Sequence, residues 1–166
     1  MTPIIPETLR TARLTLRMPV ESDLEPMVEF YASERSAMAM GPLTRAKAFT
    51  GFCVEVAHWH QKGFGNYTIT LGDTSIGQCG IWQPEGWDEA EVGWLLWDGF
   101  EGNGYATEAA QAVLDMVAEK GRQPPVSYIT RENAASKAVA TRLGAAFEAP
   151  HPRWADMEIW RHRGAA

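Results

Sequence analysis

The sequence predicts a single mixed α/β domain, and three observations support this. The chain has 166 residues, which suits one hydrophobic core and leaves little room for a second. Its hydrophobic fraction of 45% and charged fraction of 22% are those of ordinary soluble globular proteins. Segments with the two-residue period of strands are interspersed with segments of helical period, without internal repeats. We therefore expect residues 1–166 to form one domain.

The charge and the hydropathy pattern exclude several classes of partner. The formal net charge is -6, so no overall basic field exists to hold nucleic acid or an anionic membrane, and a cationic substrate suits the chain better. The opening MTPIIPETLR lacks the basic and apolar segments of a secretion signal. No other run approaches the roughly 20 apolar residues of a membrane span. We expect a cytoplasmic protein with no nucleic-acid or membrane partner.

Cysteine and histidine spacing does not indicate a metal site. Cys53 and Cys79 lie far apart, and neither has a second cysteine or a histidine at zinc-ligand spacing. We predict that both are buried free thiols. His58 and His60 would lie on different faces of a helix, so we expect them on a solvated helix surface.

The first third of the chain predicts a strand, a helix and a loop. Residues 9–18 alternate apolar with polar side chains, which favours one half-buried strand. A helix follows, for which we expect Asp23 to be the N-cap. Its apolar stripe consists of Leu24, Met27, Val28 and Tyr31. Residues 33–43 have no clear period and contain a Gly-Pro pair, so they predict a loop of unusual apolarity.

The middle of the chain predicts a helix followed by three strands. The helix runs from Thr44 to about Gln61 and ends at Gly63. Its expected apolar face is made of Phe49, Phe52, Cys53 and Val56. Residues 64–71 and 75–82 predict a hairpin around the Gly72-Asp73 turn, and residues 90–97 predict a further strand.

The last part of the chain predicts two helices and three strands. Residues 106–120 have the clearest helical period in the sequence, and Gly121 follows as a C-cap. A short strand is expected at 125–129, and then a helix capped by Asn133 and ended by Gly144. Residues 145–149 and 156–162 predict two closing strands.

Between the strand at 90–97 and the long helix lies a glycine loop, DGFEGNGYATEA. A strand, a glycine loop and a helix N-terminus in succession form an anion site, because free N–H groups and the helix dipole face the ligand. Gly102 and Gly104 can adopt positive φ and let the ligand approach the main chain. Tyr105 and Ala106 stand where a P-loop needs Lys and Ser or Thr, and the GxGxxG spacing is absent. The loop alone is equally compatible with an ordinary glycine turn.

Several motifs in order resemble those of the GCN5-related N-acetyltransferases, and of their RimJ/RimL-type branch, which acetylates protein N-termini and small amines. They are RLTLRMPVESDLEPM, AEVGWLL, FEGNGYATEA and NAASKAVATRLGAAFE, and together they extend over nearly the whole chain. The resemblance implies an α/β (α+β) fold with a central mixed, mostly antiparallel twisted sheet. About seven strands, splayed in the middle, and about four flanking helices are expected.

The resemblance also implies acetyl-CoA as co-substrate, no metal, and a set of binding residues. The pyrophosphate is expected at Gly102, Asn103, Gly104, Tyr105 and Ala106. The pantetheine arm is expected along the backbone of Trp94, Leu95 and Leu96 and beside Asn133 and Ser136. Asn133 is equally expected to act only as a helix N-cap. Gly99 stands where the family usually has Gln or Arg, so one side-chain contact to the phosphates is expected to be lost.

Acetyl transfer to an amine requires a base, because an alkylammonium has a pKa near 10. Our candidate is Glu91, which by resemblance lies on the strand beside the thioester; the alternative is a solvent-facing residue paired with an arginine. Ser136 would lie near the sulfur, or have no function. The expected acceptor pocket is bordered by Tyr31, Met40 and Trp82, together with Met38 and Trp87, although such side chains are more often core.

The sequence thus predicts an N-acetyltransferase that moves the acetyl group of acetyl-CoA to a primary amine by direct attack, without a covalent cysteine intermediate. The acceptor would be a protein N-terminus or a small amine, and the enzyme a monomer or homodimer. The alternative is a non-catalytic acyl-CoA-binding or sensing domain of the same fold. A nucleotide-binding protein using the same loop is a third possibility, and the missing Lys-Ser/Thr pair disfavours it.

Overall fold

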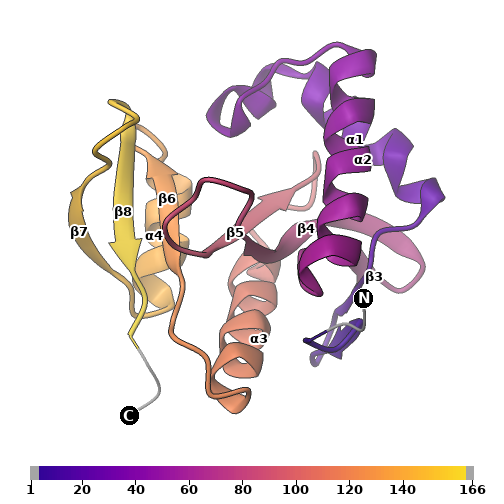
Figure 1. Ribbon diagram of the computed structural model, residues 1–166. Helices are drawn as coiled ribbons and strands as arrows, with labels where there is room; N and C mark the ends of the chain where they lie inside the picture. Colours follow the sequence, from indigo (N-terminus) through magenta and orange to yellow (C-terminus); the bar gives the residue numbers. More distant parts are fainter. Residues whose placement is uncertain (1–3, 164–166) are drawn as a thin grey trace.

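The computed structural model describes residues 4–163, which form eight strands, four α-helices and two short 3₁₀ helices (Figure 1). The strands are β1 (Thr8–Arg10), β2 (Thr15–Arg17), β3 (Asn66–Leu71), β4 (Thr74–Trp82), β5 (Glu91–Leu96), β6 (Val126–Thr130), β7 (Ala146–Pro150) and β8 (Met157–Arg161). The helices are η1 (Glu21–Asp23), α1 (Leu24–Ala32), η2 (Glu34–Ala39), α2 (Arg45–Lys62), α3 (Tyr105–Glu119) and α4 (Ala134–Arg142).

All eight strands belong to one sheet, in the order β1-β2-β3-β4-β5-β6-β8-β7. Every neighbouring pair is antiparallel except β5 and β6, which are parallel and paired at a single position, Glu91 with Val126. This confirms the predicted mixed, mostly antiparallel sheet that is splayed in its middle.

The sheet has eight strands instead of about seven because residues 9–18 do not form one strand. The chain turns between β1 and β2, where the Thr11 hydroxyl accepts a hydrogen bond from Leu14 N at 2.9 Å. The expectation of a single strand was wrong. The alternation itself changes phase between Leu9 and Leu14, an odd spacing that a continuous strand would not have.

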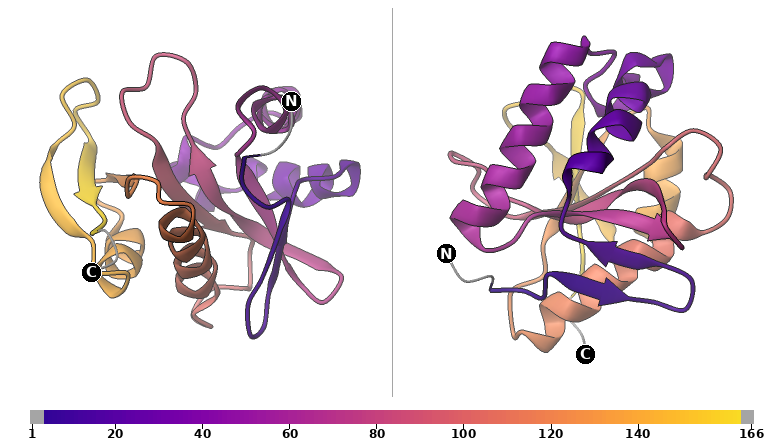
Figure 2. Two further views of the ribbon diagram at one scale, coloured as in Figure 1. Left: turned by 60° about the horizontal axis from the view of Figure 1, so that its bottom comes forward. Right: turned by 90° about the vertical axis from the view of Figure 1, so that its right-hand side faces the viewer.

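The helices form a layer on each face of the sheet. Figure 2 shows α1 and α2 on one face and α3 on the other, and α3 also contacts α4. The main core lies between the sheet and α3. It includes Leu16, Tyr67, Ile69, Ile76, Val92, Ala109, Ala110 and Val113, each fully buried. A smaller core beneath α1 and α2 consists of Met27, Phe30, Phe52 and Trp97. None of the helices described is long and apolar enough to cross a membrane.

Helix α2 has the predicted ends but a different buried face. Thr44 is its N-cap and Gly63, at φ 73°, is its C-cap. Of the predicted apolar face, Phe52 is buried and Val56 packs against the second core, but Phe49 is 51% exposed and Cys53 is also exposed, so the predicted burial of these two was wrong. The residues that are buried are Ala48, Phe52, Glu55, His58 and Trp59. Both cysteines are free thiols, as predicted.

His58 is buried, contrary to the expectation of a solvated helix surface. Its Nδ1 lies 2.8 Å from the carbonyl oxygen of Phe64, and its Nε2 accepts a hydrogen bond from Gln83 N at 3.3 Å. The ring also stacks on Trp82, with centroids 4.3 Å apart. Burial of this polar ring is tolerated because both nitrogens have partners.

Helix α1 begins directly after Asp23, as predicted, but the Asp23 side chain does not cap it. That carboxylate instead pairs with Arg17 at 2.7 Å and accepts a hydrogen bond from Thr68 at 2.9 Å. Most of the expected loop at 33–43 is the 3₁₀ helix η2. The remaining predicted helices and strands lie within one or two residues of their expected positions.

Candidate active site

The glycine loop connects β5 to the N-terminus of α3, as the sequence predicts. Gly99, Gly102 and Gly104 all have positive φ, at 86°, 77° and 79°. A Cβ atom at Gly102 would meet nothing within 4 Å, so the backbone conformation alone requires glycine there. Gly104 is the N-cap of α3, and no side chain caps the helix. The first turn of α3 therefore has N–H groups that no capping side chain occupies.

Asn103, a predicted phosphate-contacting residue, turns its side chain back into the loop. Its Nδ2 donates to the carbonyl oxygens of Phe100 and Glu101, at 3.4 and 3.0 Å. The side chain therefore stabilises the loop, and the main chain of residues 102–106 remains available to an anion.

The loop is held in place by Arg13, a residue that the sequence analysis did not identify. Its Nη1 donates to the carbonyl oxygen of Asn103 at 3.0 Å, and its guanidinium lies 4.6 Å from the centroid of the Tyr105 ring. Glu108 pairs with Arg13 at 2.6 Å and accepts a hydrogen bond from Thr11. Although burial acts in the opposite direction, these bonds lower the pKa of Glu108, so it stays ionised and holds Arg13.

Acidic side chains near the loop are also paired. Arg35 on η2 forms ion pairs with Asp98, at 3.0 Å, and with Glu101. These pairs offset the negative charge that would otherwise oppose an anionic ligand at the loop.

The strands β5 and β6 separate after their single pair, and Figure 1 shows them diverging toward the glycine loop. Peptide groups along a strand point alternately to its two neighbours. The carbonyl oxygens of Ala90 and Val92 face β6, whereas the N–H of Trp97 faces β4 and donates to Ile76. By this alternation the peptide groups of Trp94 and Leu96 face the gap, and that of Leu95 faces β4.

Glu91 lies at the point where the strands separate, on the face of the sheet that α2 covers. It is directly opposite Trp82 in the β4–β5 pairing, and its Oε2 accepts a hydrogen bond from Tyr128 N at 3.4 Å. Burial raises the pKa of Glu91 to about 7, against the weaker opposing effect of the Tyr128 N–H. Glu91 was alternatively expected to pair with an arginine, but it is the neighbouring Glu89 that does so: it binds Arg161 at 2.8 and 3.0 Å.

Four aromatic rings cluster around Tyr128, whose backbone N–H binds Glu91, and form what we call the aromatic wall: Trp87, Tyr128, His151 and Trp154. Tyr128 lies 5.2 Å from Trp87 and 5.0 Å from His151, and His151 stacks on Trp154 at 4.1 Å. The pKa of Tyr128 is raised, first by burial and then by the negative charges of Glu89, Glu91 and Asp88. Arg153 lies 5.7 Å from the centroid of the Trp154 ring and pairs with Asp88 at 3.3 Å, so the wall combines aromatic faces with both acidic and basic groups. Of its members only Trp87 was expected from the sequence.

The three predicted acceptor-site residues have different surroundings. Trp82 lies across the strand pair from Glu91. Tyr31 belongs to the core beneath α1 and α2, where burial and the nearby Glu55 raise its pKa. Met40 is 85% exposed at the end of η2, with a positive φ of 67°. Of the three, only Trp82 is brought next to Glu91.

Asn133 and Ser136 lie at the start of α4, which follows β6. The Asn133 side chain accepts a hydrogen bond from Ser136 N at 3.0 Å, which makes Asn133 the N-cap of this helix. The capping role expected for Asn133 is therefore present, and its carboxamide N–H₂ is the part left for a ligand. Ser136 is half-buried in the first turn.

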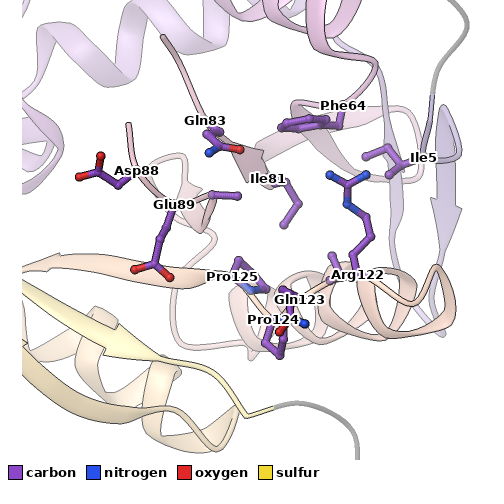
Figure 3. A pocket seen from close by; sticks show the side chains of 12 residues that line it. Ile5, Phe64, Ile81, Gln83, Asp88, Glu89, Arg122, Gln123, Pro124 and Pro125 are labelled. Carbon is purple, nitrogen blue, oxygen red and sulfur yellow. The ribbon is translucent and has the colours of Figure 1, made fainter. Parts of the chain in front are cut away.

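A cavity of about 420 Å³ lies at the other end of α3. Figure 3 shows Arg122 and Phe64 on one side of it and Asp88 and Glu89 on the other. None of the predicted site residues lines this cavity. Among residues 4–163, no group of three or more His, Cys, Asp or Glu side chains could hold a metal ion.

Comparison with known proteins gives a consistent picture. The family model described as "Acetyltransferase (GNAT) domain" matches residues 13–146. An acetyltransferase from Agrobacterium tumefaciens is 40% identical, with a TM-score of 0.88 over 98% of this chain and 97% of that one. RimL, a ribosomal alpha-N-protein acetyltransferase solved with coenzyme A, has a TM-score of 0.76 over 96% and 97%, at 20% identity, and so supports the fold alone.

A curated relative is the uncharacterized protein YkkB of Bacillus subtilis (strain 168), 31% identical over 110 residues. The match covers 60% of this chain and 64% of YkkB, so it spans less than two thirds of that relative's length. The family model extends over most of the chain, and the Agrobacterium structure over nearly all of it. The chain belongs to the GNAT family of acetyltransferases.

Proposed function

We propose that this protein transfers the acetyl group of acetyl-CoA to a primary amine by direct attack of the amine on the thioester. One observation carries the proposal. Glu91, a carboxyl group with its pKa raised to about 7, lies where β5 and β6 separate, on the strand that leads to the glycine loop. A base and an anion-binding loop are thus joined by one short strand, as transfer from a diphosphate-bearing thioester requires.

The residues present fit acetyl-CoA. The main-chain N–H groups of residues 102–106 are the proposed ligands of the pyrophosphate, because they surround a helix N-terminus with no capping side chain. The peptide groups of Trp94 and Leu96 would bind the pantetheine amides, since they face the gap beside β6. Leu95 is left out of this set because its peptide group faces β4. The Asn133 carboxamide N–H₂ and Ser136 would contact the arm from α4.

Glu91 is the proposed general base. The acceptor reaches the enzyme as an ammonium with a pKa near 10 and must lose a proton before its nitrogen can attack. A carboxyl with a pKa of about 7 is partly ionised at neutral pH and is a stronger base than an ordinary glutamate. It would accept this proton directly or through one water. The leaving thiolate, with a reference pKa near 8.5, needs little help, so Ser136 would at most assist its protonation.

The acceptor is a protein N-terminus or a small amine. Support comes from the aromatic wall and from the Glu91 carboxylate beside Tyr128, since aromatic faces and a negative charge both attract an ammonium group. RimL, which shares the fold, is an alpha-N-protein acetyltransferase. Trp82 would border the same pocket. Tyr31 and Met40, which do not adjoin Glu91, would act at most on its outer part.

Two measurements test the proposal. Calorimetric titration with acetyl-CoA, coenzyme A and ATP should give binding of the first two and none of ATP. A thiol-release screen over small amines and N-terminal peptides should then find at least one acceptor. Binding of acetyl-CoA without turnover on any amine would instead favour a non-catalytic acyl-CoA-binding domain, and binding of ATP alone would favour a nucleotide-binding protein.

A further inference from the structure

The separation of β5 from β6 is abrupt, although both strands are regular on their other sides. β5 pairs with β4 at six positions, and β6 pairs with β8 at five. Between β5 and β6 there is one pair, at which Val126 N donates to Ala90 O at 3.1 Å. Irregular backbone in either strand therefore does not account for the separation, and its cause must lie at the junction itself.

Two side chains occupy the backbone groups that would form the next hydrogen bond. In a parallel ladder that continued in this register, Tyr128 N would donate to Val92 O. Instead, Val92 O accepts from the Ser127 hydroxyl at 2.7 Å, and Tyr128 N donates to the Glu91 carboxylate at 3.4 Å. Both backbone groups are satisfied without the strands meeting, so pairing stops at this point.

The Ser127 hydroxyl is held in place by His162, which follows β8. Ser127 and His162 are each 2% exposed, and Ser127 Oγ lies 2.9 Å from His162 Nε2. A carbonyl oxygen only accepts, so the single hydroxyl proton goes to Val92 O. His162 must then donate from Nε2, which assigns its tautomer. Burial lowers the pKa of His162 to about 4, in keeping with a neutral ring.

The arrangement leaves one polar atom of His162 without a partner among residues 4–163. Once Nε2 carries the proton, Nδ1 is a bare acceptor, and it is buried with no hydrogen-bond partner among residues 4–163. Such groups are uncommon and costly in proteins. The pair lies where β5 and β6 separate, so the hydrogen bond from Ser127 to Val92 O bears directly on their pairing.

We propose that Ser127, held by His162, is a positioning residue that keeps β5 and β6 apart beside the proposed binding site for acetyl-CoA. Ser127 acts where the strands separate, and Glu91 completes the arrangement by taking up the Tyr128 N–H. The inference rests on the proposed function for the identity of the ligand, but the separation of the strands can be tested without it.

The test compares Ser127→Val with Ser127→Thr, which are nearly isosteric and differ in the hydroxyl group. In the valine variant, Val92 O is left free to accept from Tyr128 N. We expect the Tyr128 amide to become more protected against hydrogen exchange, and the Kd for acetyl-CoA to rise about tenfold, the equivalent of one hydrogen bond. Because the Tyr128 N–H would then leave the Glu91 carboxylate, kcat should change as well, so Tyr128 exchange and the Kd are the two readouts of the strand separation. The threonine variant should restore both readouts.

Thermal unfolding would show whether the variants fold, and Ser127→Ala is the substitute should the larger valine side chain overpack the site. Unchanged Tyr128 exchange together with an unchanged Kd in the variants without a hydroxyl would overturn the inference. If the Tyr128 amide gains protection in Ser127→Val but the wild type binds no acetyl-CoA, the role of Ser127 is upheld and the proposed function is refuted.

Discussion

At the scale of single residues, burial gives two glutamates the same pKa but different surroundings. Burial raises the pKa of both Glu91 and Glu55 to about 7. Glu55 lies inside the protein, 9% exposed, where its Oε2 accepts a hydrogen bond from Gln78 at 2.6 Å. Glu91 is half-buried at the edge of the gap between β5 and β6. Of the two, Glu91 is the one at the strand junction, so position and not pKa distinguishes the proposed base.

Replacing Glu91 tests the base. We expect Glu91→Gln to lower kcat by roughly 10²–10⁴-fold, the usual contribution of a general base, and to change the Kd for acetyl-CoA little. In the wild type, kcat should rise with pH through about 7 as this carboxyl loses its proton. That inflection should be absent from the pH–rate profile of the variant.

Glu89→Gln is the matched control, because Glu89 is a neighbouring carboxylate that is already paired with Arg161. The Glu89→Gln variant should keep the pH–rate profile of the wild type. An inflection near pH 7 that persists in Glu91→Gln would remove Glu91 from the mechanism.

At the scale of elements, the loop before α3 and the strand before that loop form most of the proposed site. The loop depends on glycines with positive φ and on Arg13, which connects the β1–β2 turn to the carbonyl of Asn103. The strand depends on the alternation of its peptide groups, which offers Trp94 and Leu96 to the gap. The groups proposed to bind acetyl-CoA are thus mainly main-chain atoms, and neighbouring elements set their positions.

A glycine substitution tests the loop. Gly102→Ala forces a residue with a Cβ into a positive φ of 77°, a strain of roughly 1–2 kcal/mol. The loop should relax, and the Kd for acetyl-CoA should rise about tenfold if that strain displaces the N–H groups. Calorimetry on this variant measures the effect directly.

Gly121→Ala provides the comparison, because Gly121 also has a positive φ, of 62°, and open space around its Cβ position. It lies beyond the far end of α3, so it should lose similar stability without losing affinity. Equal effects of the two substitutions on the Kd would show that the loop does not bind the ligand.

The elements were largely predictable from the sequence, because hydrophobic period, caps and turns are local signals. Thr44 and Asn133 cap the N-termini of α2 and α4, and Gly63 ends α2, as predicted. The buried face of α2 was not predictable, because Glu55 and His58 are polar residues whose burial depends on Gln78, Phe64 and Trp82, which come later in the chain.

The site was predictable only where it is local. The glycine loop and Glu91 belong to one continuous stretch of sequence and could be identified there. Arg13, Ser127 and His162 could not be, because their roles depend on contacts with residues 35 or more positions away. Tyr128 and Trp154 could have been noted as candidates for the aromatic wall because both side chains are aromatic. Their spacing in the sequence does not indicate that the two rings meet.

At the scale of the whole molecule, one sheet carries helices on both faces, and among residues 4–163 the ladder between β5 and β6 is reduced to a single pair. Under the proposed function, this separation would let a ligand held on the α3 side reach the face that carries Glu91. The net charge of -6 suits an ammonium acceptor, while Arg13 and Arg35 offset acidic residues near the loop where an anion would bind.

The buried Glu55 makes global stability depend on pH. Its pKa is higher in the folded protein than in the unfolded chain, so its contribution is fully present below about pH 4.5 and is lost as the pH rises through about 7. Urea unfolding at pH 5 and pH 8 should show a decrease at the higher pH. We expect Glu55→Gln to reduce that decrease by about 2 kcal/mol. A decrease of the same size in wild type and variant would mean that Glu55 is not the group responsible.

A crystal structure of the protein with coenzyme A tests the central claim most directly. The account predicts pyrophosphate oxygens within hydrogen-bond distance of the main-chain N–H groups of residues 102–106, and a pantetheine arm between β5 and β6 against Trp94 and Leu96. Coenzyme A bound elsewhere, for example with its phosphates at Arg122 in the cavity at the far end of α3, would contradict it.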